Sequence, residues 1–148
     1  NVSLWSFVRR ATTARRIPSR AGAAVARLAS TTPEGTANTL LVLGRARDAA
    51  GRVWVRARLP ILPNGTTGWV PRRALGGYRS VYTRLVVDLR RRRATLLRNG
   101  RPLMRADIGV GLDQWPTPRG RFYIRNKLVT AAGSTARLRS GRAPDQPF

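Results

Sequence analysis

Few side chains in this sequence could carry covalent or metal-assisted chemistry. The 148 residues include no Cys and no His, so the chain holds no thiolate, no imidazole and no disulfide. Between residues 82 and 128 the only carboxylates are Asp88, Asp107 and Asp113. Paired-carboxylate catalysis needs two groups held close together, and a metal site normally adds His or Cys. We therefore predict no catalytic residue, no metal site and no cofactor, and we interpret Asp88 and Asp107 as partners of neighbouring arginines.

Residues 82–128 have the pattern of short antiparallel strands. Aliphatic content predicts strands over 86–89 and 94–97, and the four arginines at 90–93 must turn between them as solvated surface. Asn99-Gly100 favours a type I′ hairpin, because both residues tolerate positive φ. It joins a strand ending at Arg98 to one over 103–108. A loop at 109–115 follows, and the phrase Thr-Pro-Arg-Gly at 117–120 leads into a strand over 121–125.

The same phrases resemble a known family when they are taken in order. They are Val87-Asp88-Leu89, Asn99-Gly100, Gly109 and Gly111, and then Thr117, Pro118, Gly120 and Phe122. In this order they resemble the opening of an L,D-transpeptidase catalytic domain, a β-sandwich. The resemblance implies a parent enzyme whose Cys thiolate takes an acyl group from a peptidoglycan tetrapeptide stem and passes it to an amine on a neighbouring stem. A His-bearing strand and a Ser-His-Gly-Cys loop would complete that enzyme, and neither is in this sequence.

The composition therefore excludes the Cys and His on which that enzyme's catalysis depends. We expect a truncated, inactive L,D-transpeptidase in which residues 82–128 are the N-terminal strands of an incomplete sandwich, and we assign no substrate-binding residue. Glycines 109 and 111 do not make a phosphate loop, because no helix N-terminus is expected after them. The Thr-Pro-x-Gly-x-Phe phrase contributes architecture, although a turn held by two prolines and a glycine would explain the same residues.

Residues 5–77 predict a small all-β barrel built from short apolar runs bounded by Gly, Pro, Asn or Thr. Over 53–59 the alternation places Val53, Val55, Ala57 and Leu59 on a core face and Trp54 on a solvated face with two arginines. The phrase at 68–75, Gly-Trp-Val-Pro-Arg-Arg-Ala-Leu, looks like the last strand and terminal turn of a bacterial SH3-like domain.

That second resemblance implies a binding or spacing module for cell-wall material. The alternative is that Trp54 and Trp69 are ordinary barrel residues that only fill space. Residues 76–78, Gly-Gly-Tyr, serve as a short linker to the second unit.

Residues 129–148 show neither strand alternation nor a helical period, and we expect a disordered tail. One hypothesis for this segment is a shifted reading frame. If each codon borrows the last base of the preceding one, synonymous codons allow 135–148 to be spelled as Tyr-Gly-Pro-Ala-Ala-Phe-Gly-Thr-Ser-Ala-Arg-Ser-Ala-Val. That spelling is close to a phrase that follows this point in L,D-transpeptidases.

The net charge of +23 suggests a polyanion as partner. Lys127 is the single lysine among 29 basic residues, and the arginines are scattered instead of lining one helix. We therefore expect peptidoglycan stem peptides or glycan and anionic cell-wall polymers as partners, with a basic nucleic-acid-binding β-barrel as the competing class. No apolar run predicts a transmembrane helix. The family implies an extracytoplasmic, cell-wall or secreted location, and no signal sequence lies in this chain.

Overall fold

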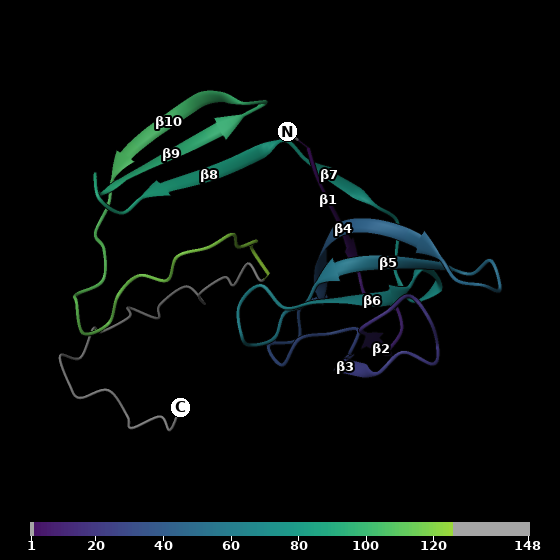
Figure 1. The fold of residues 1–148 in the computed structure, drawn as a ribbon. Helices are drawn as coiled ribbons and strands as arrows, with labels where there is room; N and C mark the ends of the chain where they lie inside the picture. Colours follow the sequence, from purple (N-terminus) through teal and green to yellow (C-terminus); the bar gives the residue numbers. More distant parts are fainter. Residues whose placement is uncertain (1, 126–148) are drawn as a thin grey trace.

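The computed structural model describes residues 2–125, and its secondary structure in that range is almost entirely β (Figure 1). Seven strands form one antiparallel sheet in the order β3-β2-β6-β5-β4-β1-β7, and three form a second in the order β10-β9-β8. The mainly β fold class predicted from the sequence is confirmed. The segment 129–148, for which we expect disorder, lies outside the described residues.

The two sheets follow one another along the chain. The first contains β1 (Ser3–Phe7), β2 (Thr12–Arg15), β3 (Ala24–Leu28), β4 (Thr39–Arg47), β5 (Val53–Arg58), β6 (Thr67–Pro71) and β7 (Arg79–Val81). The second contains β8 (Thr83–Asp88), β9 (Arg93–Arg98) and β10 (Arg101–Asp107). A single 3-10 turn, η1 (Arg72–Ala74), follows β6. Within residues 2–125 no helix is long and apolar enough to cross a membrane.

The core of the first unit is a strip of alternate residues on neighbouring strands. Leu40 of β4, Val55 of β5 and Val70 of β6 are fully buried, and Val55 lies directly opposite Val70. Ala57 and Leu59 continue the same side of β5, as the alternation predicted. Burying aliphatic side chains is the main stabilising contribution available to a unit of this size.

After η1 the chain returns to its beginning and closes the unit. Leu75 pairs with Val8 in an isolated bridge, and both side chains are buried in the core. The backbone N–H of Arg9 donates to the carbonyl of Ala74 at 2.8 Å. The strand and terminal turn expected in the phrase at 68–75 are therefore present as β6 and η1.

Trp54 does not lie where the alternation placed it. We expected its side chain on the solvated face of β5, but it is only 2% exposed. The turn between β4 and β5 explains this, because Asp48 Oδ2 accepts the indole N–H of Trp54 at 3.0 Å and the Nε–H of Arg52 at 2.8 Å. The expectation of a solvated Trp54 is wrong, since a strand pattern cannot include a carboxylate supplied by the adjoining turn.

The residues expected to act as a linker are bound to the first unit. Tyr78 packs against the core, and the guanidinium of Arg72 lies 4.7 Å from the centre of its ring. Strand β7 follows and pairs with β1, so the first sheet extends to Val81, beyond the expected boundary at residue 77. Only Tyr82 separates the two sheets.

Two tight turns connect the three strands of the second sheet. Asn99 and Gly100 have φ values of 52° and 82°, which confirms the predicted type I′ hairpin between β9 and β10. The preceding turn lies at 89–92 instead of 90–93, because Asp88 Oδ1 accepts the backbone N–H of Arg91 at 2.9 Å and β9 already begins at Arg93.

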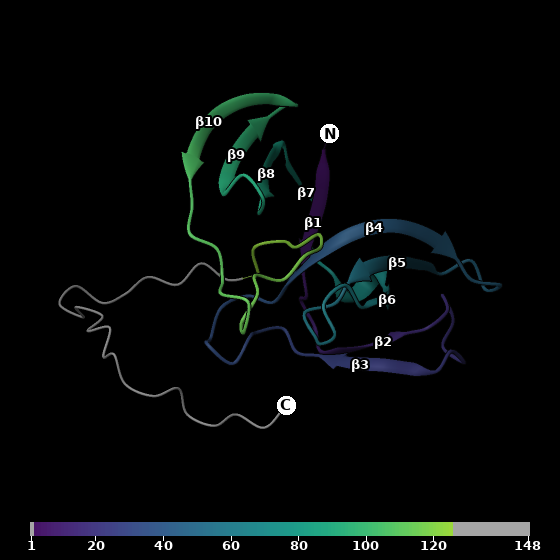
Figure 2. The same cartoon turned by 60° about the vertical axis from the view of Figure 1, so that its left-hand side comes forward.

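The strand predicted over 121–125 is not formed. These residues have no strand assignment, and they lie against the first unit instead of adding to the second sheet (Figures 1 and 2). The prediction is wrong because Tyr123 and its neighbours find hydrogen-bond partners on the barrel.

One face of the second sheet is apolar and exposed. Leu85, Leu96 and Met104 are aligned across its three strands, and Leu85 and Met104 are 59% and 56% exposed. Figure 2 shows this sheet curling away from the barrel. No segment within residues 2–125 covers the face, and both of the sheet's edges are unpaired in that range. An isolated sheet of three strands with an open face is marginal in stability.

Two leucine substitutions distinguish the two units. Leu40→Ala should lower the free energy of unfolding by about 2–5 kcal/mol, because it leaves a cavity in a fully buried strip. Leu85→Ala removes the same atoms from an exposed face and should change it by less than about 0.5 kcal/mol. Urea denaturation followed by tryptophan fluorescence measures both. Equal costs would mean that the face carrying Leu85 is covered.

Asp48 should make stability depend on pH in an acidic window. Its hydrogen bonds to Trp54 and then to Arg52 lower its pKa from 3.8 to about 2, against the opposing effect of burial. Because the folded-state pKa is depressed, the contribution is complete above about pH 4 and is lost as pH falls towards 2.

The matched comparison is Asp48→Asn against Asp107→Asn, since the Asp107 side chain is 87% exposed. Denaturation midpoints should show Asp48→Asn less stable than the unmodified chain at neutral pH, with the difference shrinking below pH 4. Asp107→Asn should show almost no difference at any pH. A pH-independent loss in Asp48→Asn would exclude the carboxylate's charge as the cause.

Candidate functional site

Asp88 and Asp107 of the second unit are each paired with an arginine and not with one another. Asp88 lies 4.0 Å from the Nη1 of Arg91, and Asp107 lies 3.5 Å from the Nε of Arg93. The interpretation of both as arginine partners is confirmed. All four side chains are substantially exposed, so these pairs contribute little stability. Within residues 2–125 no three acidic, Cys or His side chains gather where they could hold a metal ion.

The loop that follows β10 is closed by one side chain. Thr117 Oγ1 accepts the backbone N–H of Gly111 at 2.8 Å, and the N–H of Trp115 donates to the carbonyl of Leu112 at 3.0 Å. A Cβ at Gly111 would collide with the carbonyl of Trp115, so this position requires glycine. The Thr-Pro-x-Gly phrase thus has an architectural role here, as we expected.

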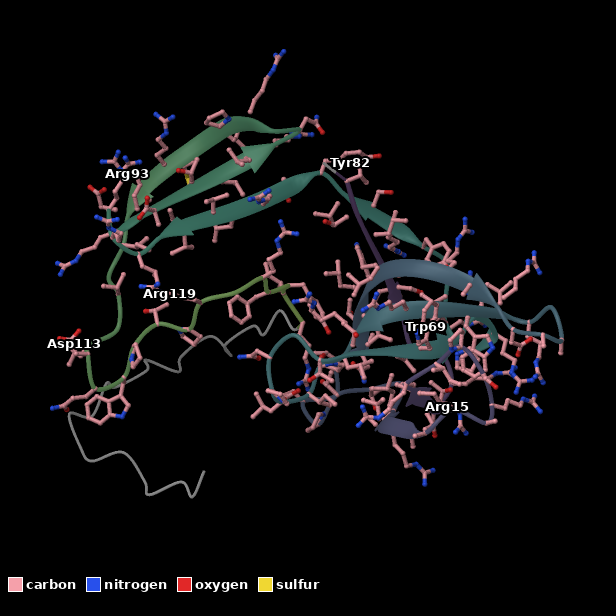
Figure 3. The ribbon with its side chains drawn as sticks, in the orientation of Figure 1. Arg15, Trp69, Tyr82, Arg93, Asp113 and Arg119 are labelled. Carbon is pink, nitrogen blue, oxygen red and sulfur yellow. The ribbon has the colours of Figure 1, made fainter. Side chains whose placement is uncertain are left out.

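A shallow depression lies beside this loop, at the end of the second sheet. Arg92 and Asp113 line it together with the backbone of 108–112. Figure 3 shows Asp113 on the loop that follows the second sheet. No helix follows the two glycines, which agrees with our rejection of a phosphate loop. The described residues at this depression include no pair of groups that could act as nucleophile and base.

In the first unit, Trp69 is one of the aromatic residues that remain partly exposed. It lies on β6 between Arg15 of β2 and Arg56 of β5, which are its cross-strand neighbours. Figure 3 shows Trp69 and Arg15 on adjacent strands of the barrel. A flat ring flanked by guanidinium groups can stack on a sugar or a base and pair with a nearby anion.

A second aromatic group was missed by the sequence reasoning. Trp5 and Phe7 of β1 meet edge to face with ring centres 4.8 Å apart, and the guanidinium of Arg79 lies 5.6 Å from each ring. The signal was present as Trp-Ser-Phe, in which alternate aromatic residues share one face of a strand. Pairing with β7, which brings Arg79 to this face, could not be predicted from a segment interpreted as a linker.

Comparison with protein families supports the resemblance found in the second unit. Residues 82–143 match the family model of the L,D-transpeptidase catalytic domain (YkuD). The match contains every phrase on which the resemblance rests, from Val87 to Phe122. No curated protein and no solved structure matches the chain. The two antiparallel sheets are consistent with the mainly β fold of this family.

The matched region begins where the two sheets meet. Residue 82, the first of the match, is the single residue between β7 and β8, and its carbonyl accepts the backbone N–H of Asn99 at 3.0 Å. All three strands of the second sheet and the loop closed by Thr117 belong to the matched region. The part of the chain that matches the family model is thus the part that has an exposed apolar face.

Two glycine substitutions test whether the loop is as tightly closed as described. Gly111→Ala should open it, because the added carbon meets the carbonyl of Trp115, whereas Gly109→Ala has no atom within 4 Å of the added carbon. Amide hydrogen exchange of Trp115 should accelerate by roughly tenfold in Gly111→Ala, equivalent to about 1.4 kcal/mol, and stay unchanged in Gly109→Ala. Identical rates in both variants would refute the closed loop.

Proposed function

We propose that this chain is the N-terminal portion of an L,D-transpeptidase, in which an SH3-like barrel precedes the opening strands of the catalytic domain. The family match over 82–143 is the observation that carries the proposal. The barrel assignment is supported by the meander β4-β5-β6, the turn η1 after the Trp-Val strand, and the return of Leu75 to pair with Val8.

In this proposal the 148-residue chain binds wall material and does not cross-link it. Acyl transfer in the parent enzyme requires a thiolate and a base, and the printed sequence contains neither Cys nor His. Its partners would be peptidoglycan stem peptides or glycan and anionic wall polymers, outside the cytoplasm. Support for these partners comes from the family match and from the charge of +23. Under the frame-shift hypothesis for 129–148, the catalytic Cys and His would be encoded in the other reading frame.

A second candidate is binding of single-stranded nucleic acid. The observation in its favour is Trp69, which has Arg15 and Arg56 on either side. Proteins that bind single-stranded nucleic acid combine aromatic rings that stack on bases with arginines that follow the nucleic-acid backbone. Nucleic-acid binding differs from peptidoglycan binding in its salt dependence, because the affinity for phosphates falls steeply and log-linearly as ionic strength rises.

The activity prediction follows from the missing nucleophile. Purified chain incubated with a tetrapeptide-bearing muropeptide and a labelled D-amino acid should show no exchange above the rate without protein. The same chain should co-sediment with insoluble peptidoglycan at 150 mM salt, at roughly physiological ionic strength. Exchange above background would contradict inactivity.

Two further results decide between wall and nucleic-acid binding. Retention on peptidoglycan stripped of anionic wall polymers should fall only slightly between 50 and 200 mM salt, because recognition of sugars and peptides releases few counterions. An affinity for single-stranded DNA that exceeds it, and falls by roughly a thousandfold over that range, would favour the second candidate. Trp69→Ala should weaken whichever ligand binds the barrel face, and Trp115→Ala, in the exposed loop of the other unit, is its matched control.

A further inference from the structure

The segment 121–125, here called the strap, contacts the first unit through two of its side chains and one backbone carbonyl. Tyr123 donates its phenolic hydrogen to the carbonyl of Thr39 at 3.1 Å, with the carbonyl of Arg58 at 3.5 Å. Arg58 Nη1 donates to the carbonyl of Arg121 at 2.8 Å, and Arg125 lies 3.8 Å from the carboxylate of Glu34. These contacts join residues more than sixty positions apart in the sequence.

The strap is held from one side only, in the manner of an extended peptide. Tyr123 is half-buried, and burial raises the pKa of its phenol. Its two neighbours, Phe122 and Ile124, are 54% and 85% exposed. Alternate side chains therefore face the barrel and the solvent, which is the period of an extended chain lying on a surface.

The surface under the strap is the end of the hairpin where β4 begins and β5 finishes. Thr39 is the first residue of β4 and Arg58 the last of β5, and Glu34 lies in the loop just before them. These residues offer two backbone carbonyl acceptors, a guanidinium donor and a carboxylate. Figures 1 and 2 agree that the described chain comes back to this end of the barrel after leaving the second sheet.

We propose that Glu34, Thr39 and Arg58 form a docking surface for an extended segment with the pattern Tyr-x-Arg, and that the chain's own strap is its occupant. The first unit then holds residues 82–125 at two places, through the covalent connection at Tyr82 and through the strap. This role is intramolecular and does not depend on whether the barrel also binds wall polymer.

The absence of cysteine makes a specific test possible. Glu34→Cys and Arg125→Cys introduce the only two thiols, at positions whose native side chains meet. A short flexible bismaleimide should cross-link them within one molecule. Adding Tyr123→Ala should slow the cross-linking by about fivefold or more, since a half-buried hydrogen bond and its ring contacts are lost, and Tyr123→Phe should lie between the two.

Phe122→Ala is the matched control, because its ring faces away from the surface, and it should leave the rate unchanged. Far-ultraviolet circular dichroism confirms that each variant keeps its strands. A synthetic peptide Gly-Arg-Phe-Tyr-Ile-Arg, at millimolar concentration, should compete with the strap and slow cross-linking, while the same peptide with Ala for Tyr should not. Equal rates for Tyr123→Ala and Phe122→Ala, or no cross-link in the starting pair, would overturn the proposal.

Discussion

Burial of one strip of alternate aliphatic residues, Leu40, Val55 and Val70, is the interaction on which the rest of this molecule depends. Those residues lie on three adjacent strands, so a single apolar layer holds the meander together and lets β1 and β2 add to its sides. The turn η1 and the bridge between Val8 and Leu75 then join the segment after β6 to the segment after β1.

The second sheet depends on a different kind of interaction. Its shape comes from local turn chemistry at Asn99-Gly100 and at Asp88, and its apolar residues remain exposed in the described chain. Local signals set register, but without burial they supply little stability. The family match falls on this less buried unit.

Sequence reasoning succeeded where one local rule decides the outcome. Strand alternation identified the buried side of β5, and positive φ at Asn99 and Gly100 identified the hairpin. The phrases from Val87 to Phe122 lie within the residues that match the L,D-transpeptidase family model. Arginine excess likewise predicted that isolated carboxylates such as Asp107 would be paired with arginine.

It failed where a distant group supplied the partner. Trp54 is buried because Asp48 in the next turn accepts its indole hydrogen, and 121–125 leaves the sheet because Thr39 and Arg58 offer hydrogen-bond partners. Neither partner is visible in the segment's own pattern. The candidate site shows the same limit, since the group of Trp5, Phe7 and Arg79 exists only once β7 pairs with β1.

Native-state amide hydrogen exchange, resolved by residue, tests most directly the claim that one buried strip stabilises the chain. Amides of Val55 and Val70 should exchange only through global unfolding, and those of Leu96 and the rest of β9 should exchange at least about a hundredfold faster, through opening of the second sheet alone. Equal protection of β5 and β9 in a monomer would contradict the account, because it would mean that the second sheet has a core of its own.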